Sequence, residues 1–343
     1  ANSCRLEECL LKASDMIGWK EKGMRTVMPD GKIRARGVAM AMQGSSISNC
    51  DVGSVTVKLS DEGTYHITVG CTDMGTGCDT IIAQFAADVL ETPIDNISVY
   101  GVDTDISPYD SGSYASSTTY LTGMAAVKAC EQLRERIIAL AAVRMNKDAS
   151  ALTFDGENVI DESDGAKMSL FDIATASMCN NEISLEVTYS HSSPVSPPPF
   201  MAACAEIEAD PETGAIELLD YTACVDCGTV VNTNLARVQT EGGLLQGIGM
   251  TLYEDIWYDE RGKNLSNSFM QYKVPSRLDT DRIRVEFDSS YEPTGPFGAK
   301  SIGEIVINTP APAIADAVYN ATGVWINELP ITPEKILKGM KVI

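Results

Sequence analysis

A glycine-rich loop at residues 295–304 constrains most strongly what this chain can form. It reads Gly-Pro-Phe-Gly-Ala-Lys-Ser-Ile-Gly-Glu, and its glycines remove side chains where a backbone must approach a ligand closely. Asn308, Thr309 and Pro310 follow and predict that a helix begins there. We therefore expect a loop that runs into a helix N-terminus, with Lys300 adding positive charge, which suits an anion.

The loop ends on one carboxylate, Glu304, with apolar neighbours at Ile302 and Ile305. An apolar setting disfavours the charged carboxylate and would suit a general base. The same residues also fit a glycine-rich surface turn with an exposed glutamate. The local pattern alone leaves both interpretations open.

Composition narrows the class of protein. A length of 343 residues fits one large domain or two ordinary ones, and 44% hydrophobic residues predict a packed core. A net charge of −22 argues against a nucleic acid or an anionic membrane as partner. No apolar run is long enough to cross a bilayer, and residues 1–11 are too polar for a signal peptide. We expect a cytoplasmic protein.

Cysteine usage agrees with a reducing compartment, because ten cysteines are scattered along a long chain. Only Cys224 and Cys227 have the spacing of a metal or redox pair. Zinc would need a second pair or two histidines, and the chain has only His66 and His191. The favoured interpretation is two small apolar residues at a strand end, with the metal or redox pair as the alternative.

Two parts of the chain show the same order of elements. Each part reads hairpin, helix, strand, polar loop, helix, judged from alternating and helical apolar spacing and from turn residues. The predicted ranges are 55–59, 65–69, 80–90, 97–100, 103–117 and 119–146 in the first part, and 203–209, 216–222, 235–253, 283–287, 288–308 and 310–321 in the second.

This repetition predicts an α+β fold with two related lobes built from hairpin and strand layers and helices. We place an N-terminal helix and lead-in at 1–30, the first lobe at 31–165 and the second at 166–343. The loops 103–117 and 288–308 both lie between a strand's end and a helix's start, where open α/β layers bind ligands. One crevice shared by the lobes is the predicted ligand site.

Three segments carry the chemistry. The hydroxyl-rich residues 113–118, ahead of a helix, suit a phosphate or pyrophosphate. The segment 74–77, Met-Gly-Thr-Gly, suits a flat, hydrogen-bonding ring approached by backbone. Glu304 suits acid–base work. Each of these three sequence signals is weak evidence for a ligand site when taken alone. Their equivalent placement in the two repeats makes a shared site a stronger prediction.

The segment 298–304, Gly-Ala-Lys-Ser-Ile-Gly-Glu, resembles the signature of the xanthine dehydrogenase and aldehyde oxidoreductase family of molybdenum hydroxylases. The resemblance covers nearly the whole chain and corresponds to the C-terminal half of that family's molybdenum-binding region. Further matching segments, in the family's order, are 72–77, 112–118, 240–249 and 272–275.

This resemblance implies a molybdopterin cofactor, in dinucleotide form, with a sulfido or selenido ligand on molybdenum. Molybdenum would be held through the pterin dithiolene, with Ala115 and Glu304 near it and no direct protein ligand. Thr76 stands where the family usually has Gln, which puts one oxo-ligand contact in doubt. The implied cofactor-binding residues are Met74, Gly75, Thr76, Gly77, Tyr114, Ala115, Ser116, Ser117, Thr118, Gln246, Lys300, Ser301, Ile302 and Gly303.

The implied reaction is hydroxylation of an electron-poor carbon with water as the oxygen source and Glu304 as the base. Electrons would leave through Fe-S clusters to FAD. The family's first molybdenum-binding half, its iron–sulfur cysteine patterns and its flavin domain have no counterpart in this sequence. That split resembles the medium molybdopterin subunit of nicotinate dehydrogenase, which implies a large molybdopterin subunit, an Fe-S subunit and a FAD subunit as partners.

Several functions remain open at this point. The resemblance favours an aromatic N-heterocycle as substrate, nicotinate first, with purines or aldehydes as alternatives for the same chemistry. A non-catalytic scaffold subunit that keeps the fold is a second class of function. An unrelated phosphate-binding protein built on the strand–loop–helix sites is a third.

Overall fold

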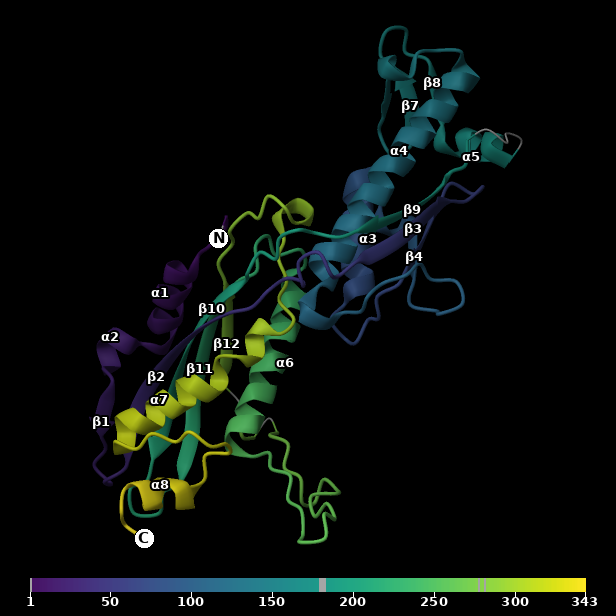
Figure 1. Cartoon of the computed structure of the whole chain (residues 1–343). Coiled ribbons are helices and arrows are strands. Elements are labelled where there is room, and N and C mark those ends of the chain that lie inside the picture. Colours follow the sequence, from purple (N-terminus) through teal and green to yellow (C-terminus); the bar gives the residue numbers. More distant parts are fainter. Residues whose placement is uncertain (1, 179–182, 277, 281) are drawn as a thin grey trace. The chain divides into compact units, whose positions relative to one another are not determined.

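The computed structural model describes residues 2–178, 183–276, 278–280 and 282–343 (Figure 1). The chain forms two compact units, and both are discontinuous in sequence. The first unit comprises Ala1–Gln43, Pro198–Tyr291 and Ile302–Ile343, and the second comprises Gly44–Pro197 and Glu292–Ser301. Within the described residues, none of the helices combines the length and apolar character needed to cross a membrane.

The first unit is built on a five-stranded sheet with the order β1-β2-β10-β11-β12. Neighbours are antiparallel except β12, which runs parallel to β11 after the crossover through helix α6 (Thr233–Leu252). The strands are β1 (Arg25–Val27), β2 (Ile33–Met42), β10 (Phe200–Ala209), β11 (Ile216–Asp226) and β12 (Ile283–Phe287).

Helices cover both faces of this sheet, so residues 200–205 of the central strand β10 are apolar on both sides, as doubly covered strands are. Helix α1 (Leu6–Ile17) packs one face, burying Cys9, Ala13 and Ile17 against Ala202, Cys204 and Cys224. Helix α7 (Pro310–Thr322) packs the other face. A Cβ on Gly37 of β2 would lie 2.2 Å from the Ala313 carbonyl oxygen, so glycine there permits the close approach of α7.

The second unit is built on a four-stranded sheet with the order β5-β4-β3-β9. Helices α3 (Cys78–Leu90) and α4 (Gly123–Met145) contribute to one core with the inward-facing strand residues. The outward-facing positions are polar: Thr56 and Thr188 share an exposed hydrogen bond of 2.8 Å. The strands are β3 (Gly53–Leu59), β4 (Tyr65–Val69), β5 (Ile97–Tyr100) and β9 (Glu186–His191).

Smaller elements complete the described residues. A three-stranded sheet has the order β6-β7-β8, and a π-helical turn precedes α4. Their bounds are β6 (Leu152–Phe154), β7 (Asn158–Asp161), β8 (Lys167–Ser169), α2 (Trp19–Lys22), α5 (Leu170–Met178), α8 (Pro333–Gly339) and, for the helical turns, η1 (Ile94–Asn96), η2 (Tyr114–Ser116), η3 (Thr118–Thr122), η4 (Ala149–Ala151), η5 (Pro296–Gly298) and η6 (Ile305–Ile307).

The predicted repeat is present. The second unit's order β3-β4-α3-β5-α4 matches the first unit's order β10-β11-α6-β12-α7, and in each the third strand lies parallel to the second. Each repeat also pairs its first strand with an outside antiparallel strand, β9 or β2. The α+β class is confirmed. Pattern reading missed β9, β1 and α8, which are short or weakly patterned.

The compact units divide the chain differently from the predicted lobes at 31–165 and 166–343. Strand pairing is the physical reason. β2 pairs along its whole length with β10, which draws residues before 44 into the first unit. β9 pairs with β3, which keeps residues after 165 in the second unit.

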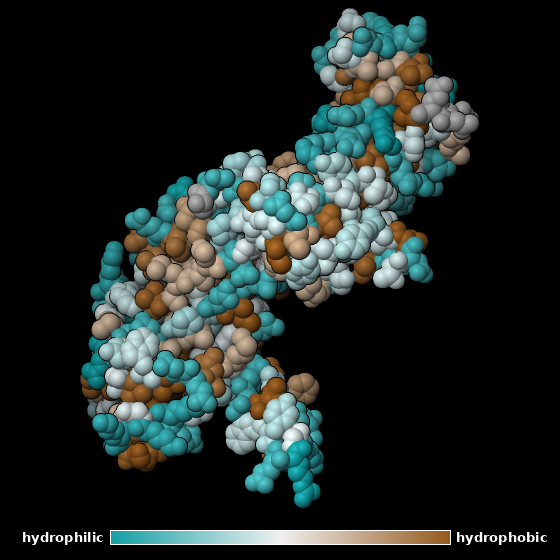
Figure 2. All heavy atoms as spheres, viewed as in Figure 1, coloured by the Kyte–Doolittle hydropathy of each residue, from teal (hydrophilic) through white to brown (hydrophobic). Residues whose placement is uncertain are grey.

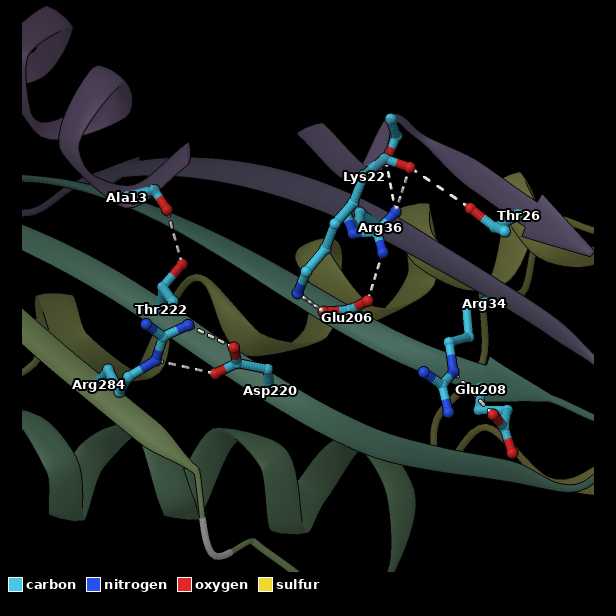
Figure 3. A network of polar contacts seen from close by, with 11 residues as sticks. Ala13, Lys22, Thr26, Arg34, Arg36, Glu206, Glu208, Asp220, Thr222 and Arg284 are labelled. Atoms are coloured by element: carbon cyan, nitrogen blue, oxygen red, sulfur yellow. Dashed lines mark hydrogen bonds and ion pairs between the residues drawn. The ribbon is translucent and has the colours of Figure 1, made fainter. Parts of the chain in front are cut away.

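A buried ion-pair network joins β2 to β10 at a register position where Arg36 faces Glu206 (Figure 3). Both side chains are buried, and an Arg36 guanidinium nitrogen bonds to the Glu206 carboxylate. Lys22 Nζ donates to the same carboxylate at 2.6 Å, and Arg36 Nη1 donates to the Gly23 carbonyl at 2.6 Å. Burial opposes ionisation of Glu206, but the bonds from Lys22 and Arg36 outweigh it and lower its pKa.

We predict that Arg36→Met lowers the free energy of unfolding by about 3 kcal/mol, because it removes a donor from a buried carboxylate. Urea unfolding of the full-length protein measures the loss. The matched control is Arg34→Met: Arg34 pairs with Glu208 at 2.9 Å on the same two strands but its side chain is 41% exposed, so less than about 1 kcal/mol is expected. Equal losses in the two variants would contradict the burial argument.

Candidate functional site

The predicted site residues divide between the two units. The second unit holds the segments 74–77 and 114–118 together with Lys300 and Ser301. The first unit holds Gln246, Ile302, Gly303 and Glu304. Each group is therefore described within its own unit.

The β4–α3 loop contains two glycines, Gly75 and Gly77, whose backbone groups no side chain of their own covers. The Asp73 carboxylate accepts hydrogen bonds from the Gly75 and Gly77 amides at 2.9 and 3.1 Å, which fixes the turn. Both glycines have left-handed φ angles, +100° and +78°, that a side chain would oppose. Met74 is exposed, and a Cβ added at Gly75 would meet nothing within 4 Å. This loop fits a flat ring approached through backbone groups.

The loop before α4 is held in a strained conformation. Ala115 and Ser116 both have left-handed φ angles, 52° and 57°, which are uncommon for residues with side chains. Ser117, in the right-handed region, is buried and donates to the Gly112 carbonyl at 3.1 Å. A left-handed residue beside a right-handed one turns successive amides to one side, a conformation that binds anions. This geometry fits a phosphate group.

The loop 292–301 packs against the same part of the second unit. The buried Tyr120 hydroxyl donates to Thr294 Oγ1 at 2.8 Å. The Phe297 ring stacks on Phe85 of α3, with ring centroids 5.9 Å apart. A Cβ on Gly295 would lie 1.9 Å from the Ala299 carbonyl oxygen, so only glycine allows this turn. Within the second unit, the loop 292–301 thus packs against α3 and against η3, the helical turn that follows the loop 103–117.

Lys300 and Ser301 lie inside the second unit. Lys300 is 2% exposed, so it does not present a charge on an open loop as the sequence suggested. Ser301 donates from its backbone N–H to Ser45 Oγ at 3.1 Å and from its hydroxyl to the Gly44 carbonyl at 3.1 Å. These bonds anchor the end of the glycine-rich loop.

Glu304 precedes the short helix η6 and is exposed, so the expected desolvation is not found among the described residues. The reason is local: η6 turns Ile305 and Val306 fully into the core, and Glu304 points away from them. A Gln43 amide nitrogen lies 3.5 Å from Glu304 Oε2, and the Asn308 amide lies 3.5 Å from Gln43 Oε1. Glu304 therefore lies in a polar group made by Gln43, which follows β2, and the residues that flank η6.

Helix α6 supports the segment after Glu304. Gln239 Nε2 donates to the Gly303 carbonyl at 3.0 Å, and Gln246, two turns later on α6, is exposed. A Cβ on Gly243 would lie 2.2 Å from a Val306 methyl, which confirms that a glycine in this helix permits close packing. The sequence analysis missed Gln239 and Gln43, because their partners lie more than 60 residues away and no spacing pattern marks them.

The expected anion site at the start of α7 is not found among the described residues, and the Cys224–Cys227 segment lies in a different environment. Helix α7 begins at Pro310 as predicted, but Thr309 before it is buried and accepts a hydrogen bond from the Tyr221 hydroxyl at 3.0 Å, so this helix start is closed to an anion. Cys224 is fully buried and hydrogen-bonds Cys9, which together with burial raises the pKa of the Cys9 thiol. Cys224 lies among the apolar residues packed under α1, which fits the interpretation of a small apolar residue on a strand.

Comparison of this sequence with known proteins identifies a family and several relatives. Residues 12–281 match the family model of a molybdopterin cofactor-binding domain. The probable hypoxanthine oxidase XdhD of Escherichia coli (strain K12) is 38% identical over 345 residues, which cover 100% of this chain and 36% of that protein. Subunit gamma of the 6-hydroxypseudooxynicotine dehydrogenase complex of Paenarthrobacter nicotinovorans is 31% identical over 95% of this chain and 42% of that protein.

The fold has solved counterparts. The crystal structure of quinoline 2-oxidoreductase from Pseudomonas putida 86 superposes with a TM-score of 0.88 at 24% identity, over 99% of this chain and 46% of that one. The chain thus spans less than half the length of each of these three proteins.

We predict that Tyr120→Phe destabilises the protein by about 1–2 kcal/mol, because it leaves Thr294 and Ser193 without their shared buried partner. Thermal or urea unfolding measures this. Tyr65→Phe is the matched control: Tyr65 is equally buried in the same unit, but its hydroxyl has no hydrogen-bond partner among the described residues. Its removal should be neutral or stabilising, and the same loss in both variants would contradict the anchoring role of Tyr120.

Proposed function

Because the chain belongs to the family of molybdopterin cofactor-binding domains, we propose that it forms part of the active site of a molybdenum hydroxylase. The proposed reaction adds an oxygen atom from water to an electron-poor carbon of an aromatic N-heterocycle. The observation that carries the proposal is the family match over residues 12–281. The open glycine backbone at 74–77 and the anion-binding turn at 115–117 fit the two ends of such a cofactor.

In this proposal the second unit binds the cofactor. The backbone of Met74, Gly75, Thr76 and Gly77 contacts the pterin ring. The segment 114–118 donates hydrogen bonds to the phosphate end, which in a dinucleotide form carries two phosphates. Lys300 and Ser301 complete the proposed set in the second unit, and Ile302, Gly303 and Gln246, which lie in the first unit, stay predictions of the sequence. When bound, the cofactor supplies a molybdenum centre that takes up the two electrons removed from the substrate.

Glu304 is the proposed general base. Its carboxylate is exposed in this chain and lies beside Gln43, so water or substrate can reach it and transfer a proton to it. The Gln43 amide donates toward one carboxylate oxygen, which orients the other. In this proposal, residues outside the present sequence shield Glu304 from bulk water during the reaction.

The proposed substrate is an aromatic N-heterocycle, with nicotinate preferred. The relative named for 6-hydroxypseudooxynicotine supports this preference, and the relative named for hypoxanthine, a purine, supports the alternative that follows. Purine or aldehyde oxidation by the same chemistry is the alternative. The chalcogen ligand on molybdenum, sulfido or selenido, stays part of the proposal.

Partners are proposed to carry the rest of the enzyme: a large molybdopterin subunit, an Fe-S subunit and a FAD subunit. The greater length of the relatives supports further protein around this chain. The segment between α6 and β12 is mostly polar, as its teal and white colours in Figure 2 show, but it exposes several large apolar or aromatic side chains, which support a contact surface for it. Its exposed large side chains are Trp257, Tyr258, Phe269, Met270 and Leu278.

We predict that Glu304→Gln in the assembled enzyme keeps molybdenum and pterin content but slows turnover by roughly 10²–10⁴-fold, because glutamine cannot accept the proton. The rate at which substrate reduces molybdenum, normalised to molybdenum content, is the measurement. Electron transfer to the flavin should not change.

The control is Glu212→Gln, an exposed glutamate in the turn between β10 and β11 of the same unit. It should retain the normal rate. A near-normal rate in Glu304→Gln would remove Glu304 from the mechanism, and a protein without molybdenum in the intact complex would favour a scaffold role.

We further predict that Ser116→Asp reduces cofactor content by several-fold, since a carboxylate would face the phosphate end. Aspartate tolerates the left-handed backbone at this position, so the substitution changes charge more than conformation. Molybdenum and pterin per protein are measured against Ser98→Asp, an exposed serine on β5 of the same unit. A normal cofactor content in Ser116→Asp would show that the phosphate end does not bind this loop.

A further inference from the structure

Metal-ligating side chains gather where β4 leads into α3. The Cys78 thiol and the Asp73 and Asp79 carboxylates place one ligand atom each within 4.8 Å of one another. No other group of three such residues meets this condition in the part of the chain that the structure describes. The proposed function leaves these side chains unused, because a molybdopterin cofactor holds its metal through the pterin.

A second thiol borders this group. Cys71, at the other end of the loop, hydrogen-bonds Cys78, and both are free cysteines that are 1% and 2% exposed. The two thiols flank a tight turn, with six residues between them in the sequence, and their contact brings two sulfur atoms together. Cys71 lies outside the group of three ligand atoms within 4.8 Å of one another, and its contact with Cys78 makes it the candidate fourth ligand, for two sulfur and two oxygen ligands in all.

The carboxylates have capacity for a cation. Asp73 uses Oδ1 to hold the Gly75 and Gly77 amides, which leaves Oδ2 for a metal. Asp79 Oδ1 lies 3.7 Å from Cys78 Sγ. Among the described residues, neither carboxylate forms an ion pair with a basic side chain, although they lie close together. A divalent cation would offset this local negative charge.

The types of ligand atom in this group, sulfur and carboxylate oxygen, indicate which metal ion would bind. Thiolates favour zinc-like borderline ions over magnesium or calcium, which take oxygen ligands. Two cysteine sulfurs and two carboxylate oxygens supply the four ligands of a closed tetrahedral zinc site. Binding would release both thiol protons to solvent and leave two thiolates and two carboxylates around the ion.

We propose that Cys71, Asp73, Cys78 and Asp79 form a zinc-type metal site that fixes the loop between β4 and α3. Its structural effect is to tie the end of β4 to the first turn of α3 across the glycine turn. The site stands on these four residues alone. Its effect on cofactor binding rests on the proposed function, since residues 74–77 lie between its ligands.

The test uses the full-length protein that carries this sequence, freed of loosely bound metal with a chelator and titrated with Co²⁺. One equivalent should produce a sulfur-to-cobalt absorption band, and Zn²⁺ should abolish it by displacement. Cys78→Ser should lose the band. Cys224→Ser should keep it, because the Cys9–Cys224 pair belongs to no metal-ligand group in the described residues.

Asp79→Asn keeps both thiols and the shape of the side chain. It is the second loss-of-binding variant, used if Cys78→Ser folds poorly. Zn²⁺ should raise the melting temperature of the unmodified protein and not that of Asp79→Asn. Identical cobalt spectra in the unmodified protein and Cys78→Ser would overturn the site, as would a Cys71–Cys78 disulfide found by mass spectrometry in protein purified under reducing conditions. Molybdenum content is measured separately, so failure of the zinc site and failure of the proposed function remain distinguishable.

Discussion

The antiparallel pairing of β2 with β10 is the contact on which the rest of the arrangement depends. It joins Ile33–Met42 to Phe200–Ala209 along their full lengths, across more than 150 intervening residues. Closing so long a loop costs conformational entropy, and the ladder, the buried Arg36–Glu206 pair and helices on both faces offset that cost. Everything between the two strands is then free to form a second unit of its own.

Residues 103–117 and 292–301, from the polar loops of the two repeats, belong to the same unit. The loop 103–117 belongs to the second unit by position, and the loop 292–301, although it follows β12 of the first unit, packs in the second. Both contain residues with side chains in left-handed conformations, Ala115 and Ser116 in one and Phe297 in the other. Such conformations cost about 1–3 kcal/mol each and persist where surrounding contacts enforce them, commonly at binding sites. The Tyr120–Thr294 bond is one of those contacts.

Thiol chemistry in this chain is decided by neighbours more than by spacing. Cys224 and Cys227 have the familiar separation, yet Cys224 faces Cys9 among apolar residues under α1. Cys71 and Cys78 have no recognised spacing, yet they touch and lie beside two carboxylates. The same functional group is therefore inert packing in one unit and a candidate ligand in the other, because the second set is paired with oxygen ligands and the first is not.

Local signals in the sequence determined a great deal. Apolar periodicity and turn residues were enough for most helices and strands, for the internal repeat and for the start of α7 at Pro310, since these depend on neighbours along the chain. The sequence motifs were enough to identify the family. Tertiary structure alone decided the domain boundaries, the burial of Lys300 and Thr309, and the exposure of Glu304. It also selected Gln43 and Gln239 as neighbours of the glycine-rich loop, because strand pairing and helix packing bring together residues whose separation in sequence carries no pattern.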